Sequence, residues 1–493
     1  MGVAYNSRII TDGLVLALDA ANNKSILSTV EVLVVAGGGG GGGSTAGGGG
    51  GGGVLYSSAV SITPGSAITA TVGDGGAGTV RSDQGAPTNT SGGNSVFGAL
   101  TAIGGGRGYS GSDTYTPRTS AVGGSGGGGG YYGGGLDPKG SGTSSAGTAG
   151  QGFAGGDGAA IGEWGGGGGG GAGGAGGAQV ANNSLRTGGT GLGFNISGTL
   201  QYYGGGGGGG CYSNGFSLGG IGGGGNGGDG SAYVPTAGAT NTGGGGGGGG
   251  YYQYGPGGGA GGSGIVIVRY PGSQRATGGT VTSVGGYTIH TFTTSGTFTP
   301  TWGDMSTNGN TGTLTNGPTY SSANGGSIVF DGSNDYIDCG NTSSLSITVG
   351  TVCAWFKKPL GSGYKGLVDK GRDGYGAWSL NVDEVGNTAT FKARISGTNR
   401  SIIASSNYGN NIWTYVCGVY DGTTLAIYQN GIISNSASYS GTIDTNSVSV
   451  KIGAASDGLY FGGNVSNTAI YNRALTAAEI SQNFNALRGR YGI

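Results

Sequence analysis

Residues able to perform acid–base or metal chemistry are scarce in this chain. Its 493 residues include one histidine, His290, and four cysteines, Cys211, Cys339, Cys353 and Cys417. Zinc-protease helices need two histidines and zinc fingers usually need paired cysteines, and no Cys-x-x-Cys pair is present. We therefore interpret the cysteines as free thiols and His290, which lies in the strand pattern TIHTF, as a structural residue.

Paired carboxylates for glycoside hydrolysis are also missing. From residue 302 onward the chain has only two glutamates, Glu384 and Glu479. Glu479 belongs to a helix-capping pattern and Glu384 lies in a polar turn, so no pair is placed to span a glycosidic bond. We expect no enzymatic activity.

Acidic side chains do cluster at one place. Asp331, Asp335 and Asp338 fall within a short polar segment that also contains Asn334. Calcium binds carboxylate and amide oxygens, so these three aspartates are a candidate calcium site. The alternative is that the segment forms ordinary turns, for which Asp-Gly and Asn-Asp are equally typical.

Tyrosines border the long glycine runs. The candidate receptor-binding residues are Tyr131, Tyr132, Tyr202, Tyr203, Tyr212, Tyr251 and Tyr252. Tyrosine mixed with small polar residues is typical of binding surfaces, because rigid rings give contact area at low entropy cost. The alternative is that each tyrosine pair caps and shields the end of a glycine run.

Glycine accounts for 132 residues, concentrated between residues 37 and 301. The longest runs occupy residues 37–43, 47–53, 165–171, 204–210 and 243–250. Flexible linkers are Gly/Ser mixtures without bordering aromatic residues. We therefore favour packed polyglycine II helices, which have no internal hydrogen bonds and must bond to their neighbours.

Short β-strands are predicted from residue 302 to the end. Residues 351–356, 413–420 and 425–429 are rich in β-branched and aromatic side chains, and Asn430-Gly431 is a hairpin signal. The one convincing helix begins at the capping box TAAE of residues 476–479. Many strands with one helix favour a two-sheet sandwich.

Four segments closely resemble laminin-G-like, concanavalin-A-like jelly rolls. They are GSIVFDGSNDYIDCG (326–340), TVCAWFKKP (351–359), NIWTYVCGVYDGTTLAIYQNG (411–431) and VSNTAIYNRALTAAEI (465–480). GLVLALDAAN (13–22) resembles the first strand of that family, yet the element expected next appears only at TWGDMSTNGNTGTL (301–314). The resemblance implies a mainly β jelly-roll sandwich split by an insert. Its divisions would be 1–25 for the first strand, 26–301 for the insert and 302–493 for the rest.

The ends of the insert also carry a resemblance. VEVLVVAGGGG (30–40) and GSGIVIVRYPG (262–272) resemble the boundaries of a glycine-rich domain of phage and marine bacterial proteins. Since an insertion must bring its ends together, we expect strands 30–35 and 265–270 to be neighbours. GYTIHTFTTSGTFT (286–299) usually precedes the first boundary and here follows it. The glycine runs resemble the polyglycine-helix tips of tail-fibre adhesins from T-even-like phages.

Together these resemblances imply a virion appendage protein, a tail fibre or adhesin, that recognises a host-surface polysaccharide or outer-membrane receptor. Other virion proteins would be partners, a homo-oligomer such as a trimer is expected, and lysis would release the virion. Lys and Arg (21) balance Asp and Glu (22), and no apolar stretch approaches ~18 residues, so we expect neither nucleic-acid binding nor membrane insertion. The alternatives are a purely structural virion component and a bacterial surface adhesin. The second needs an export signal, and Asp12 and Asp19 interrupt any signal-peptide core.

Overall fold

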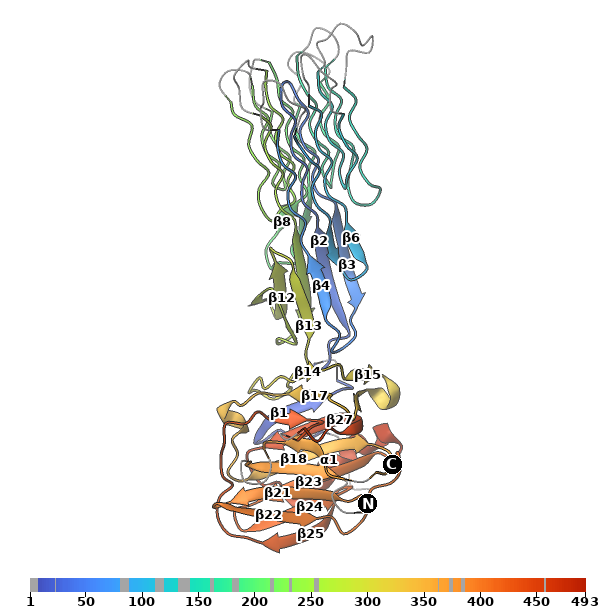
Figure 1. Ribbon diagram of the computed structural model, residues 1–493, viewed down its shortest axis with the longest axis vertical. Coiled ribbons are helices and arrows are strands. Elements are labelled where there is room, and N and C mark those ends of the chain that lie inside the picture. The colour runs from blue at the N-terminus through green and yellow to red at the C-terminus, as the bar shows by residue number, and fades with distance from the viewer. Residues whose placement is uncertain are drawn as a thin grey trace, which may run out of the picture.

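Both ends of the described chain lie in a β-sandwich at one end of an elongated molecule (Figure 1). A β-stalk rises from this sandwich, and a long bundle of extended segments continues from the stalk. The computed structural model describes residues 8–22, 24–79, 88–110, 119–131, 142–159, 164–179, 186–212, 217–229, 233–251, 257–361, 363–371, 376–382, 386–455 and 458–493.

Two antiparallel sheets form the sandwich, in the orders β15-β16-β27-β18-β23-β24-β25, with β1 on β27, and β14-β17-β26-β19-β20-β21-β22. The first contains β1 (Leu14–Asp19), β15 (Thr319–Ser321), β16 (Ser327–Asp331), β18 (Gly350–Lys357), β23 (Thr414–Tyr420), β24 (Thr424–Gln429), β25 (Ile432–Ser438) and β27 (Gly462–Tyr471). The second contains β14 (Thr313–Thr315), β17 (Tyr336–Asp338), β19 (Lys365–Asp369), β20 (Trp378–Val382), β21 (Ala389–Ile395), β22 (Thr398–Ile403) and β26 (Lys451–Ile452). The predicted mainly β jelly-roll sandwich is confirmed.

Strand β1 joins the two ends of the sequence in one sheet. It pairs antiparallel with β27, where Leu16 lies opposite Ile470. Leu16 and Leu18 are fully buried in the core between the two sheets, together with Trp302. The predicted inclusion of residues 14–18 in the sandwich is therefore confirmed, while the divisions at residues 25 and 301 stay predictions.

Helix α1 (Ala477–Leu487) begins at the predicted capping box. Thr476 accepts a hydrogen bond from the Glu479 amide, and the Glu479 carboxylate accepts one from the Thr476 amide. Arg473 also bonds that carboxylate, which lowers the pKa of Glu479 to about 2. Glu479 is therefore an ionised capping residue. Short 3-10 turns, η1 (Ala323–Gly325), η2 (Ser343–Leu345) and η3 (Arg488–Tyr491), complete the helical elements of the described chain.

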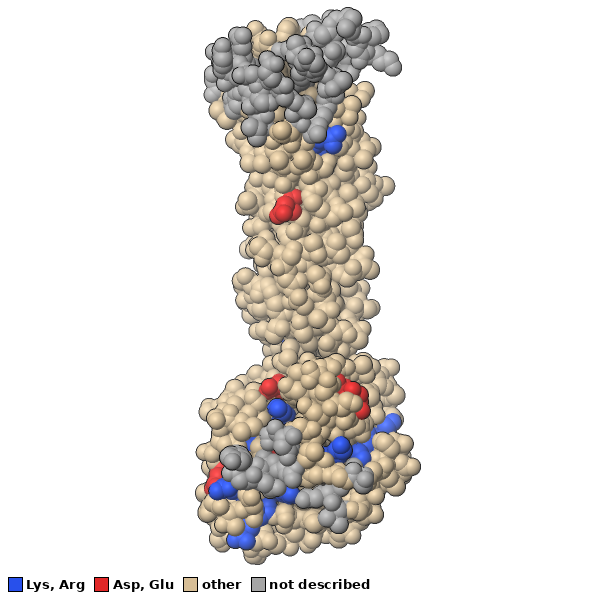
Figure 2. Space-filling model, viewed as in Figure 1, with Lys and Arg blue, Asp and Glu red and all other residues tan. Residues whose placement is uncertain are grey.

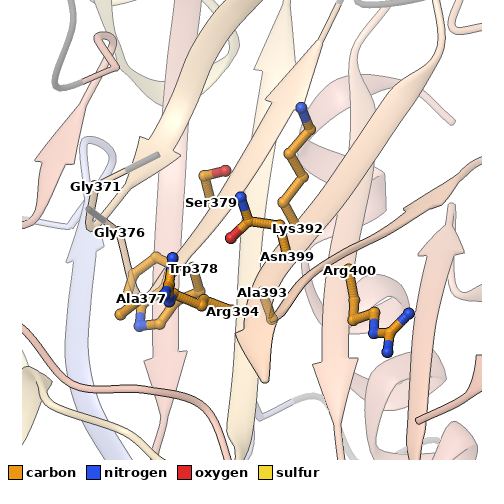
Figure 3. Close-up of a pocket in the computed structure, with 10 residues that line it drawn as sticks. All are labelled: Gly371, Gly376, Ala377, Trp378, Ser379, Lys392, Ala393, Arg394, Asn399 and Arg400. Atoms are coloured by element: carbon orange, nitrogen blue, oxygen red, sulfur yellow. The ribbon is translucent and has the colours of Figure 1, made fainter. Parts of the chain in front are cut away.

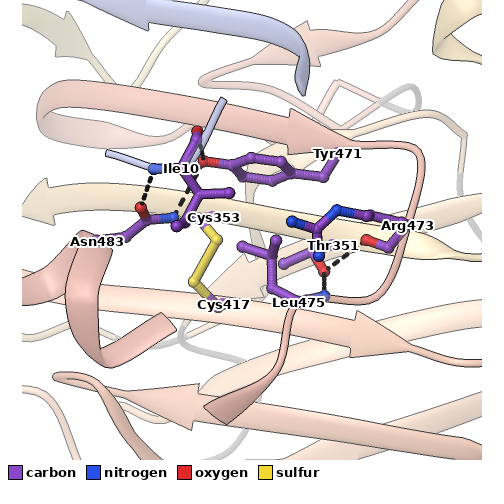
Figure 4. Close-up of a disulfide and its surroundings, with 8 residues drawn as sticks. All are labelled: Ile10, Thr351, Cys353, Cys417, Tyr471, Arg473, Leu475 and Asn483. Carbon is purple, nitrogen blue, oxygen red and sulfur yellow. Dashed lines mark hydrogen bonds between the residues drawn. A yellow bond between two sulfur atoms is a disulfide. The ribbon is translucent and has the colours of Figure 1, made fainter. Parts of the chain in front are cut away.

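The prediction that all cysteines are free is wrong for two of them. Cys353 and Cys417 form a disulfide between β18 and β23, beside the buried Tyr471 (Figure 4). The two residues lie directly opposite each other in the strand register, 64 positions apart in sequence. Cys211 and Cys339 are outside this disulfide and keep their thiols, as predicted, and both are buried.

The stalk is built from two five-stranded sheets, ordered β11-β12-β9-β2-β3 and β10-β13-β4-β5-β6, and a hairpin of β7 and β8. Its strands are β2 (Thr29–Val35), β3 (Val54–Ser61), β4 (Ile68–Thr71), β5 (Ser95–Phe97), β6 (Leu100–Ala102), β7 (Leu192–Phe194), β8 (Gln201–Tyr203), β9 (Ile265–Pro271), β10 (Ala276–Thr277), β11 (Thr280–Val284), β12 (Tyr287–Phe292) and β13 (Gly296–Pro300). The predicted pairing of the insert's first and last strong strands, β2 and β9, is confirmed, and β12 lies on the other side of β9.

His290 is a buried structural residue of β12, as predicted. Its Nδ1 donates to the Gly278 carbonyl at 2.7 Å, so its Nε2 accepts from the Tyr270 hydroxyl at 2.9 Å. That hydroxyl in turn accepts the Arg275 amide. Neutral imidazole thus satisfies every partner, and burial lowers the pKa of His290 below its ordinary 6.5.

This lowered pKa predicts acid sensitivity of the stalk. The unfolded chain takes up a proton at His290 before the folded chain does. The contribution of neutral His290 to the stability of the stalk is therefore fully present above pH 6.5. This contribution is lost as the pH falls from there toward the lower pKa of His290 in the folded chain. The melting temperature of the wild-type stalk should fall as the pH is lowered over that range. His290→Gln should remove the part of this fall that is due to protonation of His290. An identical pH profile for both proteins would contradict the prediction.

The glycine run 47–53 shows how the bundle is held together. Its amides donate to three neighbouring segments in turn, with a three-residue period. Gly47, Gly50 and Gly53 donate to the carbonyls of Tyr109, Gly106 and Ile103, respectively. Gly48 and Gly51 donate to Gly167 and Gly170, and Gly49 and Gly52 donate to Gly246 and Gly243. Three further segments, 37–43, 123–128 and 204–210, donate to its carbonyls. A three-fold helix whose peptide groups all bond to surrounding segments is polyglycine II packing. The predicted packed helices are therefore confirmed.

Residues with side chains end this lattice at its surface. Asn94, Ser91 and Gln151 accept hydrogen bonds from the amides of Gly104, Arg107 and Ile103, at 2.9, 3.2 and 2.8 Å. Such caps occupy donors that face away from the interior. Figure 2 shows that on this face few charged residues cover the stalk and bundle, while most gather on the sandwich.

Candidate functional site

Four aromatic rings meet at the end of the bundle that lies away from the stalk. Run 37–43 leaves strand β2 and run 47–53 returns to β3, so the turn between them marks this far end, here called the tip. Tyr131 donates its amide to Thr45 of that turn. We call the cluster of Tyr131, Trp164, Tyr212 and Tyr251 the aromatic platform.

Trp164 is the hub of the aromatic platform. Its ring stacks on Tyr131 at 5.0 Å, tilts against Tyr212 at 5.1 Å and meets Tyr251 edge-on at 5.5 Å. Tyr212 and Tyr251 also contact each other, with centroids 5.0 Å apart. Trp164 is 42% exposed and Tyr212 is 46% exposed. The platform therefore presents flat, partly apolar surfaces to solvent.

Interior glycine runs position these rings. Each platform residue directly adjoins a run or lies one residue beyond it: Tyr131 after 126–130, Trp164 before 165–171, Tyr212 after 204–210, and Tyr251 after 243–250. The Tyr212 amide donates to the Trp164 carbonyl at 3.0 Å, and the Tyr251 amide donates to Cys211 at 3.1 Å. The lattice thus fixes the backbone beneath each ring.

The chemistry available at the platform is stacking and hydrogen bonding. Partly exposed tyrosine and tryptophan rings offer apolar faces, and their hydroxyl and indole groups offer polar edges. Across the described ranges, no group of three or more His, Cys, Asp or Glu residues is arranged to hold a metal ion. Non-covalent recognition of a ligand that has both apolar faces and hydroxyl groups fits this surface.

The structure brings together three of the predicted tyrosines, Tyr131, Tyr212 and Tyr251. Tyr132 and Tyr252 lie outside the described residues. Trp164 is not among the residues predicted from the sequence, although it borders a glycine run in the same way as they do.

The other predicted pair is at the opposite end of run 204–210, on strand β8 of the stalk. Tyr202 is 44% exposed there and faces away from the core. Tyr203 is buried against Leu33 and Ile265, because successive residues of a strand point to opposite faces. The prediction of Tyr203 as a receptor contact is therefore corrected, and Tyr203 is a core residue.

The three aspartates of the candidate calcium site hold local backbone. Asp331 accepts from the amide of Ser333, which lowers the pKa of its carboxyl, and Asp335 accepts from the Asp331 amide. Asp338 accepts from the Gly340 amide. Turn formation therefore accounts for the cluster, and the three do not form a metal-holding group. Calcium binding at this loop stays a prediction without structural support.

A shallow hollow on the second sheet of the sandwich is a weaker candidate (Figure 3). Its cationic side chains are engaged within the protein. Arg394 pairs with Asp444 at 2.9 Å, and Lys392 and Arg400 lie over the rings of Tyr364 and Tyr439.

None of the helices in the described ranges has the length and apolar character needed to cross a membrane.

Comparisons with known proteins cover both halves of the chain. A search of curated proteins found no match. The binding domain of Paraclostridial Mosquitocidal Protein 1 is similar in structure, with 18% identity over 37% of this chain and 49% of that one and a TM-score of 0.33. Domain 4 of AbnA, a GH43 extracellular arabinanase from Geobacillus stearothermophilus, gives 17% identity over 37% and 91%, with a TM-score of 0.32. The botulinum neurotoxin serotype G binding domain gives 16% over 37% and 47%, with a TM-score of 0.31.

Two family models match the sequence. Residues 331–481 match the concanavalin A-like lectin/glucanases superfamily, within the sandwich described above. Residues 21–271 match the glycine-rich domain model, and this match covers more than half of the chain. The chain therefore belongs to the glycine-rich domain family and carries a concanavalin A-like domain in its C-terminal part.

Proposed function

We propose that this chain is an adhesive appendage protein of a tailed-phage virion and that its tip binds a host-surface glycan without cleaving it. The aromatic platform at the tip carries the proposal. Sugar rings have apolar faces that stack on aromatic side chains and hydroxyl groups that bond to polar edges. Trp164 and Tyr212 are exposed residues, and their side chains carry both an aromatic ring and a polar group.

The position of the platform supports the proposal. Glycine has no side chain, so the bundle cannot itself discriminate between ligands, and specificity must come from what the bundle displays. The sandwich, which holds both ends of the described chain, is at the opposite end of the molecule (Figure 1). This arrangement suits attachment to the particle at the sandwich and contact with the host at the tip.

Trp164 provides a built-in probe of ligand binding. The other four tryptophans, Trp302, Trp355, Trp378 and Trp413, are at most 5% exposed. Acrylamide quenching of fluorescence therefore reports mainly on Trp164. Binding can be measured on an array of neutral and acidic oligosaccharides. Each oligosaccharide that binds should then reduce the quenching of Trp164 fluorescence by acrylamide.

We expect Tyr212→Ala to weaken oligosaccharide binding and host-cell adsorption, because an anchor ring in an interface contributes on the order of 1–3 kcal/mol. Tyr202→Ala is the matched control, since Tyr202 has nearly the same exposure, 44% against 46%, but lies on the stalk. Binding should depend only weakly on salt if the ligand is neutral.

Other outcomes would point elsewhere. Adsorption that is unchanged by both tyrosine variants but is lost on chelation and in Asp335→Ala would move the site to the sandwich. Adsorption unchanged by every variant would favour a purely structural virion component. Release of reducing ends from the glycan by the purified protein would contradict non-catalytic binding.

A further inference from the structure

A buried guanidinium lies directly beneath the aromatic platform. Arg186 is only 7% exposed, and it donates from Nη1 to Gln179 Oε1 at 2.8 Å and from Nε to Ser217 Oγ at 3.2 Å. Gln179 and Ser217 are also buried, at 6% and 2% exposure. One planar side chain thus links, through hydrogen bonds, the segments that contain Gln179, Arg186 and Ser217.

Arg186 and its partners contact the backbone next to two residues of the aromatic platform, Trp164 and Tyr212. A Cβ added to Gly165 would lie 2.8 Å from Arg186 Nη1 and 2.9 Å from Gln179 Oε1, so both groups press against the residue that follows Trp164. Gly165 forms a bridge with Cys211, the residue before Tyr212. The Arg186 carbonyl also accepts the amide of Gly209, which is two residues before Cys211. Arg186 therefore braces the backbone of both residues from below.

Burying a charged side chain at this position costs desolvation free energy. Burying a guanidinium requires that its donors be satisfied, and Arg186 donates to the neutral side-chain oxygens of Gln179 and Ser217. Elsewhere in the bundle, short neutral side chains such as Asn94 and Ser91 end the lattice. The planar fork of arginine has a different advantage, because it holds two partners in one fixed geometry.

We propose that Arg186 is a positioning residue that sets the arrangement of Trp164 and Tyr212, and thereby the ligand specificity of the tip. The proposal rests on the proposed function only for its effect on binding, since the effect on ring arrangement is measured without a ligand. It predicts that the tip loses its defined ring geometry before the bundle loses its fold.

The test compares Arg186→Met, Arg186→Lys and a control, Arg269→Met. Arg269 is a partly buried arginine of the stalk, where it pairs with Glu31 at 2.5 Å. Each full-length variant is measured for thermal melting, for acrylamide quenching of Trp164 and for binding to an array of neutral hexose oligosaccharides. Lysine keeps the charge but not the fork, so Arg186→Lys separates charge from geometry.

We expect Arg186→Met to increase acrylamide quenching of Trp164 and to weaken oligosaccharide binding roughly tenfold, the effect of leaving buried partners unpaired. Arg186→Lys should restore part of both properties. Arg269→Met should change melting while leaving the quenching of Trp164 as in the wild type.

Unchanged quenching in Arg186→Met, with or without a lower melting temperature, would overturn the proposal. If that variant does not fold, Gln179→Leu and Ser217→Ala each remove one of the two bonds and must still increase quenching. If the wild type binds no glycan on the array, the proposed function fails, while the quenching data still decide the positioning role.

Discussion

Gly246→Ala will unfold the glycine-rich bundle, whereas Gly249→Ala, three residues further along the same run, will leave it folded. A Cβ on Gly246 would lie 2.0 Å from the Gly259 carbonyl oxygen, a distance that requires the neighbouring segment to move away. On Gly249 the nearest atom would be 3.3 Å away. Gly207→Val and Gly168→Val should resemble Gly246→Ala, with carbonyl oxygens at 2.0 and 2.1 Å.

The expected loss exceeds the usual ~1–3 kcal/mol of an overpacked core, because each displaced segment also loses hydrogen bonds to its other neighbours. Limited proteolysis and calorimetry of the full-length variants measure it. The sandwich has its own core and should keep its melting transition. Wild-type protease resistance of Gly246→Ala would contradict rigid packing and favour a flexible spacer.

Removing the first strand will unfold the sandwich, although most of that domain lies hundreds of residues away in sequence. Strand β1 fills a place beside β27, and its side chains Val15, Leu16 and Leu18 are buried between the two sheets. A chain that begins at residue 21 should therefore lose the melting transition of the sandwich.

A point variant gives the same test without truncation. Leu16→Ala should lower the free energy of unfolding of the sandwich by about 3 kcal/mol, as expected for a large-to-small change in a core. Asp12→Asn is the control, because the Asp12 side chain is largely exposed and its ion pair with Arg473 at 2.8 Å contributes little at the surface. A sandwich transition that is the same with and without β1 would show that the strand is dispensable.

The sequence predicts those parts of the molecule that local chemistry determines. The capping box at Thr476 and Glu479 needs only four residues to define a helix start, and Asn430-Gly431 defines its hairpin because both residues adopt positive φ. The β2–β9 pair follows from the need to close an insertion. In each case the deciding residues are close in sequence or are fixed by chain connectivity.

Features that depend on three-dimensional register escape such reasoning. Cys353 and Cys417 pair because their strands are aligned to place them opposite each other, which spacing alone does not reveal. The glycine runs are identical in composition, so nothing in them specifies that 47–53 lies beside 165–171. The meeting of Trp164 with three tyrosines depends on that unspecified order of helices, and so does the separation of Tyr202 from the tip.

The three-residue period of the bundle has a consequence for how its gene can change length. Tracts of repeated glycine codons are prone to slippage during replication, and loss of one codon preserves the reading frame. In the protein, however, that loss rotates every later peptide group of the run by about 120°, so each amide then points to the wrong neighbour. Loss of three codons removes one whole turn and keeps all directions. Viable length variants of runs such as 204–210 should therefore differ by multiples of three codons, whereas tip segments should vary in length without this restriction.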